Sequence, residues 1–395
     1  MKPRVLLVSH IYLESRYHDK LRYLAREVDL RVIGPARFSS AYGAMTAPNV
    51  SCQDYEFVAA RCWFPLWRRT STRWVLSPMD LGVRAFQPDI IHVENELTSF
   101  VLFQAIAARR LLAPRARLIV FIWANQPSNL PFARLLSVVA RMAARGADFL
   151  LVGSKASELL LREKGIDARR IAVLPAVGVD ASFHGISTET GRRVTRARLG
   201  IAADEIVVGF VGRLVEEKGL TDLAKAFEAL RARRPQDKVR LLLVGNGPMR
   251  EWLVRQPNVT VATPAPNEQV APYYCAMDMM VLPSRTTASW SEQFGRVLVE
   301  AMAVGVPLIG SSSGAIPEVI GDAGIVVPEA APDALAGAIE KLVGAPGLVR
   351  TLTERAKVRV AQRFDNAAIA AETARVYRSV LNCSPGRSST PLRGG

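Results

Sequence analysis

The stretch IVVGFVGRLVEEKGLTDLAKAFEALRARRPQDKVRLLLVGNGP, residues 206–248, contains two apolar runs separated by a helical pattern. The runs, Ile206–Val211 and Val239–Gly245, are apolar throughout except for Arg240 and do not alternate, which is typical of parallel strands covered on both faces. The amphipathic pattern between them is Leu220–Arg233. A strand, a helix and a second strand form a β-α-β unit, so this stretch predicts a doubly wound α/β domain.

The same alternation extends in both directions along the chain. Further strands are expected at 259–261, 277–282, 307–310 and 324–327, followed by helical patterns at 332–342, 348–363 and 366–381. On the N-terminal side, an earlier series of strands and helices runs from Arg4 to Leu174. Two segments break the alternation: residues 34–88 have the composition of an irregular insertion, and residues 178–204 are polar.

A chain of 395 residues is too long for one small core, and the two series predict two domains. We expect the first domain at 1–190 and the second at 191–365, with a C-terminal helix at 366–382 returning to the first domain. The Ser-, Pro-, Gly- and Arg-rich tail at 383–395 is expected to be disordered. Ligands of α/β proteins usually bind at the ends of the parallel strands, so the functional residues should lie in the loops of a central cleft.

The chain is strongly basic, with 51 Lys and Arg against 36 Asp and Glu and a formal charge of +15. The excess lies mostly in residues 1–195, which hold 27 basic and 16 acidic side chains, whereas residues 196–395 hold 24 and 20. A partner for this charge could be nucleic acid, anionic lipid or a phosphorylated substrate, or the charge could serve no specific partner.

The cysteines and the N-terminus both indicate a cytoplasmic location. The four cysteines lack the spacing of a zinc site or a redox motif, which favours reduced thiols. The apolar run Val5–Val8 is too short for the core of a signal peptide. No segment approaches about 18 uninterrupted apolar residues, so no transmembrane helix is expected.

The most informative motif is SEQFGRVLVEAMAVGVP, Ser291–Pro307, which places Glu292 and Glu300 around a helix start at Phe294 and Gly295. Backbone amides at Phe294 and Gly295, together with the positive end of the helix dipole, suit an anion. The two carboxylates are too far apart to hold the same atoms, and carboxylates bind sugar hydroxyls well. Taken alone, the spacing also fits a surface helix with two solvated glutamates.

A second motif, VGRLVEEKG at 211–219, places Arg213 and Lys218 after a strand and at a helix start. Two cations there suit a diphosphate, with Arg making bidentate contacts and Lys acting as a point charge, although ordinary surface cations fit equally. In the next such turn, VGNGP at 244–248, Gly245 and Asn246 can bring backbone amides to a nucleotide. Any strand-to-helix turn can use glycine, so this third motif supports the others and does not stand alone.

Together these motifs resemble the nucleotide-sugar half of the GT-B glycosyltransferases, specifically the large retaining family 4, or glycosyl transferases group 1. The resemblance covers residues 206–330 in consecutive motifs and includes DAGIVVP at 322–328. It implies two Rossmann-like, doubly wound domains facing a central cleft. Residues 191–365 would then bind the nucleotide-sugar, and residues 1–190 would form the acceptor side.

The resemblance also implies roles for individual residues. Arg213 and Lys218 would bind the donor diphosphate, with Gly245 and Asn246 nearby, and Phe294 and Gly295 would offer amides to it. Glu300 would hold the ribose hydroxyls, and Glu292 would face the transferred sugar. The catalytic residues would therefore be Glu292, Arg213 and Lys218.

The implied reaction is a hexosyl transfer with retention at the anomeric carbon, to a glycan or lipid-linked acceptor in polysaccharide or glycolipid synthesis. The negative charge that develops on the leaving phosphate would be stabilised by Arg213, Lys218 and the helix amides. Because no Asp-x-Asp occurs in the chain, we expect neither a metal nor another cofactor. A GT-B epimerase or phosphorylase and a non-catalytic nucleotide-sugar-binding protein are the alternatives.

The N-terminal half departs from the family pattern. The Gly-Gly loop that many members carry after the first strand is absent, and residues 10–14 take its place. Where many relatives carry a histidine after a later strand, this chain reads FIWANQPSN, with Trp123 nearest in register. His10 and Asn125 are acceptor-side candidates, and ordinary loop or core roles are the alternative for both.

The segment RCWFPLWRRTSTRW at 61–74 interleaves aromatic and Arg residues, and the helical pattern near Phe132–Arg145 adds Arg134, Arg141 and Arg145. Such segments suit peripheral contact with an anionic membrane, at the inner face of the plasma membrane for a cytoplasmic protein. A solvated, Arg-rich surface is the alternative. No RNA-binding or zinc motif supports nucleic acid, which we exclude as a partner.

Overall fold

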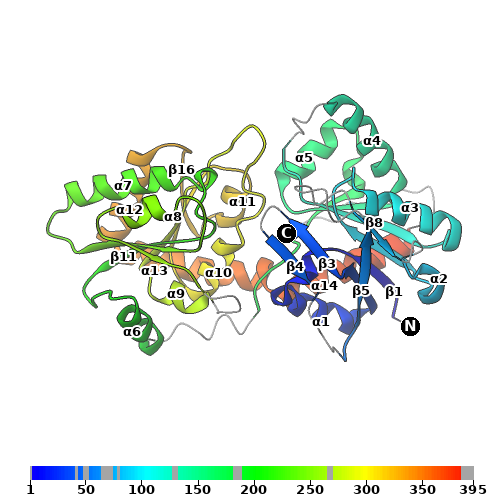
Figure 1. Cartoon of the computed structure of the whole chain (residues 1–395), viewed down its shortest axis with the longest axis horizontal. Coiled ribbons are helices and arrows are strands. Elements are labelled where there is room, and N and C mark those ends of the chain that lie inside the picture. The colour runs from blue at the N-terminus through cyan, green and yellow to red at the C-terminus, as the bar shows by residue number, and fades with distance from the viewer. Residues whose placement is uncertain are drawn as a thin grey trace. The chain divides into compact units, whose positions relative to one another are not determined.

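The computed structural model describes residues 2–40, 43–47, 53–63, 74–77, 81–126, 132–180, 189–264 and 270–383. They belong to two compact units, one up to residue 177 together with residues from 366 onward, and the other from 178 to 365 (Figure 1). The expected domain boundary after residue 190 lies inside the second unit. The expected disordered tail lies outside the described residues, apart from Cys383.

The first unit is built on an eight-stranded sheet in the order β10-β9-β8-β7-β1-β2-β5-β6. All neighbours in this sheet pair in parallel except β5 and β6, which are antiparallel. The strands are β1 (Arg4–Val8), β2 (Asp29–Pro35), β5 (Glu56–Trp63), β6 (Val75–Ser77), β7 (Ile90–Glu94), β8 (Arg117–Ile122), β9 (Phe149–Val152) and β10 (Ile171–Val173). The direction of the winding reverses between β1 and β7, which makes that point the switch point of the sheet.

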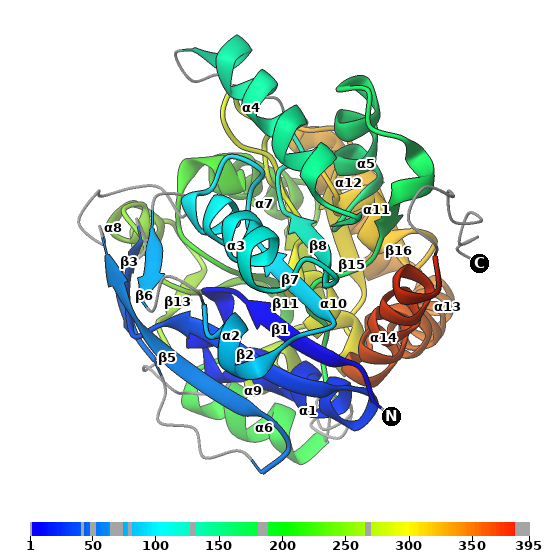
Figure 2. The same cartoon turned by 90° about the vertical axis from the view of Figure 1, so that its right-hand side faces the viewer.

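The helices of the first unit include one from the far end of the chain. They are α1 (His18–Glu27), α2 (Val83–Phe86), α3 (Phe100–Leu112), α4 (Ala133–Gly146), α5 (Lys155–Glu163) and α14 (Asn366–Asn382). Helix α14 packs along α1, as both views show (Figure 2). The Tyr377 hydroxyl lies 2.7 Å from Nδ1 of His92 on β7, and Arg378 pairs with Glu27 of α1. The C-terminal helix is thus part of the core of the first unit.

The expectation of an irregular insertion at 34–88 was wrong in part. The antiparallel pair β3 (Arg37–Ser40) and β4 (Gly43–Thr46) lies there, and β5 pairs in parallel with β2 as a member of the main sheet. Strand β5 is half exposed and reads EFVAARCW, with Arg61 among its exposed residues. Its pattern therefore lacks the continuous apolar run by which buried parallel strands are recognised.

The second unit is built on an all-parallel, six-stranded sheet in the order β13-β12-β11-β14-β15-β16. The strands are β11 (Ile206–Val211), β12 (Val239–Val244), β13 (Val259–Ala262), β14 (Met279–Leu282), β15 (Leu308–Ser311) and β16 (Gly324–Val327). The central strands β11, β12 and β14 are almost completely buried, as the apolar runs predicted. Here the switch point lies between β11 and β14.

Helices cover both faces of the second sheet, because right-handed crossovers on either side of the switch point place them on opposite faces. Helix α7 packs against α12, whereas α10 packs against α9 and α13. The helices are α6 (Glu189–Arg198), α7 (Leu220–Arg233), α8 (Arg250–Val254), α9 (Ala271–Cys275), α10 (Arg296–Val304), α11 (Ile316–Ile320), α12 (Pro332–Gly344) and α13 (Pro346–Arg359). A π-helical turn, Val360–Phe364, follows α13.

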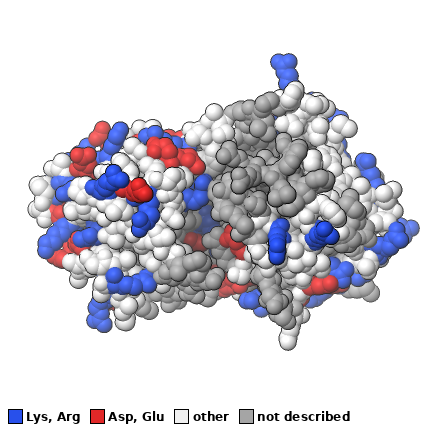
Figure 3. Space-filling model, in the orientation of Figure 1, with Lys and Arg blue, Asp and Glu red and all other residues white. Residues whose placement is uncertain are grey.

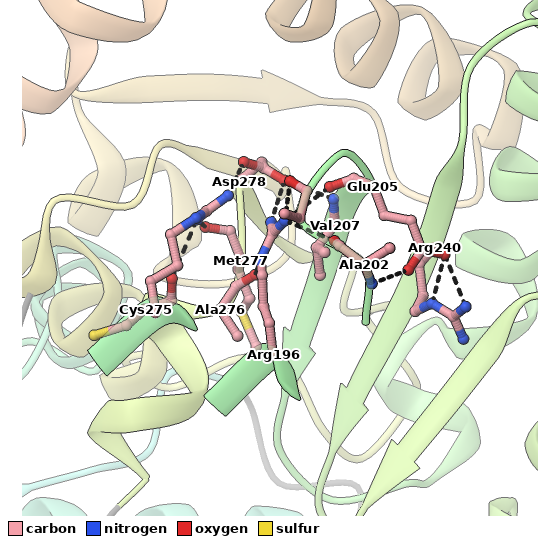
Figure 4. A network of polar contacts seen from close by, with 11 residues as sticks. Arg196, Ala202, Glu205, Val207, Arg240, Cys275, Ala276, Met277 and Asp278 are labelled. Carbon is pink, nitrogen blue, oxygen red and sulfur yellow. Dashed lines mark hydrogen bonds and ion pairs between the residues drawn. The ribbon is translucent and has the colours of Figure 1, made fainter. Parts of the chain in front are cut away.

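The polar stretch 178–204, read as a lapse in the alternation, contains helix α6. Arg196 of α6 is almost fully buried and donates to Asp278 at 2.8 Å and to the backbone carbonyl of Ala276 at 3.0 Å (Figure 4). Asp278 also accepts from the backbone amide of Val207 at the start of β11. The helix is therefore held by charged hydrogen bonds, which an apolar periodicity cannot reveal.

None of the helices in the described residues is long and apolar enough to cross a membrane.

Candidate active site

The candidate donor residues lie at one edge of the second unit, where the loops after β11 and β14 begin. Lys218 follows β11, and Glu292 follows β14. These strands are direct neighbours, so both loops leave the sheet at its carboxyl edge beside the switch point. Ligands of open α/β sheets usually bind at such a point.

Lys218 and Glu292 form a direct ion pair with 2.5 Å between Nζ and Oε2. Both side chains are nearly buried, with 12% of Lys218 and 9% of Glu292 exposed. The same carboxylate oxygen accepts a hydrogen bond of 3.0 Å from Oγ of Ser284. The Lys218 ammonium also lies 4.8 Å from the centre of the Trp290 ring, at cation–π distance. A charge buried to this extent is stable only with such partners.

Arg213 lies in the same loop as Lys218 and is more accessible. Its guanidinium is 3.5 Å from Oε1 of Glu217, and 37% of the side chain is exposed. A half-exposed ion pair at this distance contributes little to stability, because solvent screens it. The contact between Arg213 and Glu217 is therefore weak.

The turn after β12 packs closely against the Arg213 loop. The backbone amide of Leu214 donates to the carbonyl of Asn246, and the amide of Gly212 donates to the carbonyl of Val244. Gly245 has φ 150°, and a Cβ atom at this position would overlap the carbonyl of Gly212. Glycine is thus required where the two loops touch, and the exposed Asn246 follows it at the same edge.

Helix α10 begins at this edge. Gly295 is in the left-handed conformation with φ 73° and immediately precedes the helix. The Phe294 ring is buried and contacts Phe364, with 5.8 Å between the ring centres. The aromatic ring therefore anchors the chain at the point where the helix amides begin.

Glu300 lies one turn inside α10 and is nearly buried. Its Oε2 accepts a hydrogen bond of 2.8 Å from the Tyr274 hydroxyl, and its Oε1 forms an ion pair with Arg296 at 2.9 Å. The two glutamates of the motif thus have separate partners.

Sequence reasoning missed several residues that support Glu292. Ser284 binds its carboxylate, and the backbone amide of Ala315 donates to its carbonyl at 2.8 Å. Arg285, the residue after Ser284, forms a bidentate pair with Asp222 of α7, which links the loop after β14 to that helix. The signal available in the sequence was polar residues directly after the strands, in PS at 283–284 and SSSG at 311–314.

The two acceptor-side candidates, His10 and Asn125, belong to the first unit and follow β1 and β8. The His10 ring lies 4.8 Å from Phe38 and 6.0 Å from Trp74, centre to centre. Burial lowers the pKa of His10 to about 4, against a smaller opposing effect of Glu94, so its imidazole is neutral at pH 7. Its Nδ1 is buried without a hydrogen-bond partner among the described residues. Asn125 is half-buried.

One further carboxylate at this edge of the first unit escaped sequence reasoning. Glu96 follows β7, and its Oε1 accepts a hydrogen bond of 3.0 Å from the backbone amide of Ala124, directly after β8. Burial raises the pKa of Glu96 to about 7, although hydrogen bonds from the amides of Ala124 and Trp123 oppose the shift. Groups with pKa values shifted towards 7 are frequent at functional sites.

Among the described residues, no group of three or more His, Cys, Asp or Glu side chains could hold a metal ion.

Two doubly wound α/β units, each with a switch point in its own sheet, are the architecture of the GT-B class of fold. The solved structure of a glycosyltransferase from Rickettsia africae matches with a TM-score of 0.75 at 16% identity, covering 97% of this chain and all of that one. A protein from Anabaena, solved in complex with UDP, matches with a TM-score of 0.72 at 20% identity, over 95% of this chain and all of that one.

The sequence comparisons agree with the fold. Residues 17–176 match the model of the glycosyl transferase 4-like domain, and residues 205–345 match glycosyl transferases group 1. A D-inositol 3-phosphate glycosyltransferase of Segniliparus rotundus is 33% identical over 240 residues, which are 58% of this chain and 50% of that protein. The first curated relatives are matched over only 40–50% of their own length. The chain belongs to the family 4, or group 1, glycosyltransferases of GT-B fold.

Proposed function

We propose that this protein is a retaining glycosyltransferase that moves a hexose from a nucleotide-diphosphate sugar to a glycan or lipid-linked acceptor. The observation that carries the proposal is the nearly buried pair of Lys218 and Glu292 at the switch point. Lys218 is a cation suited to phosphate, and Glu292 is a carboxylate suited to sugar hydroxyls. They lie on the loops that follow two neighbouring strands.

The pair suggests how the donor is received. Without a ligand, Glu292 neutralises Lys218, and each supplies the partner that a buried charge requires. A diphosphate would take over Lys218 and would also draw Arg213 away from the weakly held Glu217. The Glu292 carboxylate would then no longer be paired with the ammonium and would be able to accept from the hydroxyls of the transferred sugar.

The same residues would assist departure of the nucleotide. Breaking the bond between the anomeric carbon and the phosphate oxygen leaves negative charge on that phosphate. Arg213, Lys218 and the amides at the start of α10 supply opposing charge at this edge, so we propose transfer without a metal ion. The leaving diphosphate would accept the proton of the acceptor hydroxyl on the same face of the sugar, which retains the anomeric configuration.

The donor part of the site also suggests where the nucleotide lies. Gly245 and the exposed Asn246 border the Arg213 loop at the carboxyl edge of the sheet, where a nucleotide attached to the diphosphate would lie. Glu300, further along α10, is suited to the ribose hydroxyls if a ligand competes with Tyr274 or Arg296. His10, Asn125 and Glu96 are the candidates for contact with the acceptor.

The test is turnover of nucleotide sugars by the wild-type protein and by Glu292→Ala, followed through release of the nucleoside diphosphate in the presence and absence of EDTA. We expect the wild type to release diphosphate with EDTA present, and the variant to lose at least about tenfold in rate. Tight donor binding without any turnover would favour a non-catalytic binding protein. Formation of an epimerised sugar or a sugar phosphate would favour the epimerase or phosphorylase alternative.

A further inference from the structure

Helix α4 (Ala133–Gly146) packs onto the first unit almost entirely through small side chains. Ala140, Ala143, Ala144 and Ala147 are buried, with 7%, 2%, 0% and 4% exposed. Their spacing is that of one helix face. Arg109 of α3 also contacts the C-terminal end of α4, where it donates to the carbonyl of Gly146 at 3.1 Å. The fold therefore uses the alanine face of α4, with Leu136 and Val139 half-buried beside it.

Other large apolar residues in and next to α4 are exposed, away from the alanine face. Phe132, directly before the helix, is 78% exposed, and Leu135, Val138 and Met142 are 61%, 41% and 65% exposed. A surface helix of a globular protein normally turns its large apolar residues to the core and its polar ones to water. In α4 the alanines are buried while these four larger apolar residues are exposed, so the four contribute little to the packing of the described chain.

The remaining exposed residues of this outer face are basic. Arg134, Arg141 and Arg145 flank the apolar residues, and the segment from Phe132 to Ala147 contains no Asp or Glu. Basic side chains also stand along the outer edge of the first unit in Figure 3. We call the seven residues Phe132, Arg134, Leu135, Val138, Arg141, Met142 and Arg145 the α4 outer face.

We propose that the α4 outer face docks on an anionic lipid bilayer, with the helix lying in the plane of the headgroups. Apolar side chains bordered by arginines, with no carboxylates among them, are typical of an interfacial helix. The apolar side chains enter the acyl boundary, and the arginines bind lipid phosphates. With 14 residues, α4 is too short to span a bilayer. A second copy of the chain fits the α4 outer face poorly, because the three arginines of one copy would repel the same three arginines of the other.

Such docking goes beyond sugar transfer and does not depend on it. It would keep the first unit at a membrane surface, where a lipid-linked acceptor is available. The test needs no sugar donor, so failure of the docking and failure of the proposed transferase activity are separate results.

The experiment measures partition of the full-length protein onto phosphatidylcholine vesicles with and without phosphatidylglycerol, by flotation. Two variants alter the α4 outer face: Leu135→Gln/Met142→Gln, and Arg134→Gln/Arg141→Gln/Arg145→Gln. Glutamine is a good helix former, so the helix should persist in both. Matched controls remove the same exposed chemistry from helices or loops of the second unit: Val194→Gln/Val358→Gln, and Arg193→Gln/Arg255→Gln/Arg350→Gln.

We expect the wild type and both controls to float with the anionic vesicles, and the wild type to float less as salt is added. Each α4 variant should lose at least about tenfold in partition. One arginine near an anionic surface is worth about fivefold, and the apolar variant removes two side chains that would enter the acyl boundary. The proposal is overturned if the wild type does not bind anionic vesicles, or if the α4 variants bind as well as their controls. It is also overturned if light scattering shows a dimer of the wild type that Leu135→Gln/Met142→Gln dissociates, because a second copy would then cover the face.

Discussion

The ammonium nitrogen of Lys218 lies 2.5 Å from Oε2 of Glu292, although the two residues are 74 positions apart in the chain. The pair joins the loops after β11 and β14, the two strands that flank the switch point of the second sheet. In the proposed function these two groups have separate roles: Lys218 would bind the phosphate of the donor, and Glu292 would bind its sugar.

The stability of this pair is open to a direct test. Lys218→Met should lower the free energy of unfolding by about 2–4 kcal/mol, because it leaves the Glu292 carboxylate nearly buried and without its counter-charge. The double variant Lys218→Met/Glu292→Gln should recover part of that loss. Urea unfolding of both single variants and the double variant measures the coupling. Strictly additive effects would show that the pair contributes no coupling energy.

Arg213 is predicted to act on the diphosphate alone. Arg213→Gln should weaken the binding of a nucleoside diphosphate about tenfold to a hundredfold, the range for a hydrogen bond to a charged group. Binding of the corresponding nucleoside should change little, because the nucleoside carries no phosphate. Titration calorimetry with both ligands separates the two effects. Equal weakening of both would place Arg213 near the base or the ribose instead.

The raised pKa of Glu96 should make the stability of the first unit depend on pH. Its folded pKa is raised to about 7 from an ordinary value of 4.5, so the folded protein holds a proton that the unfolded chain releases. Its contribution is fully present below pH 4.5 and is lost as the pH rises to about 7. Glu96→Gln removes the ionisation but can still accept from the Ala124 amide.

The melting temperature of Glu96→Gln relative to the wild type should therefore increase between pH 5 and pH 8, by the equivalent of about 1–3 kcal/mol. Scanning calorimetry of the two proteins across this range measures the difference. A difference that stays constant with pH would mean that Glu96 ionises normally in the folded protein.

The hydroxyl of Tyr377 should matter for the docking of the C-terminal helix. Tyr377→Phe keeps the ring of α14 in the core but leaves Nδ1 of the fully buried His92 without its partner at 2.7 Å. The expected cost is about 1–3 kcal/mol of unfolding free energy. Urea unfolding measures this free energy. The control is Tyr23→Phe, which removes the hydroxyl of a half-buried tyrosine in α1. A cost equal to that of the control would rule out a structural role for this hydrogen bond.

The apolar runs predicted most strands of the two sheets, because strands buried on both faces are apolar throughout. Ile206–Val211 and Gly324–Val327 have the bounds that the pattern predicted. Strand β5 and helix α6 were missed for the opposite reason. Strand β5 is half exposed, and α6 is held by buried arginine hydrogen bonds, so neither shows an apolar period.

The candidate site was predictable as a set of residues but not as a set of contacts. That Lys218 meets Glu292 follows from β14 lying beside β11, and the order of strands in a sheet is not written in any local pattern. Glu96 was missed because a carboxylate after a strand is common, and only the fold shows that this one is half-buried and accepts a hydrogen bond from the loop after β8.

The most direct test of the central claim is a thermal-shift titration of the wild type and Lys218→Ala with a panel of nucleotide sugars. We expect at least one nucleotide sugar, at about 100 times its dissociation constant, to stabilise the wild type by about 2.7 kcal/mol. The same concentration should stabilise Lys218→Ala much less. Failure of every nucleotide sugar to stabilise the wild type, or equal stabilisation of both proteins, would contradict a donor site built on Lys218 and Glu292.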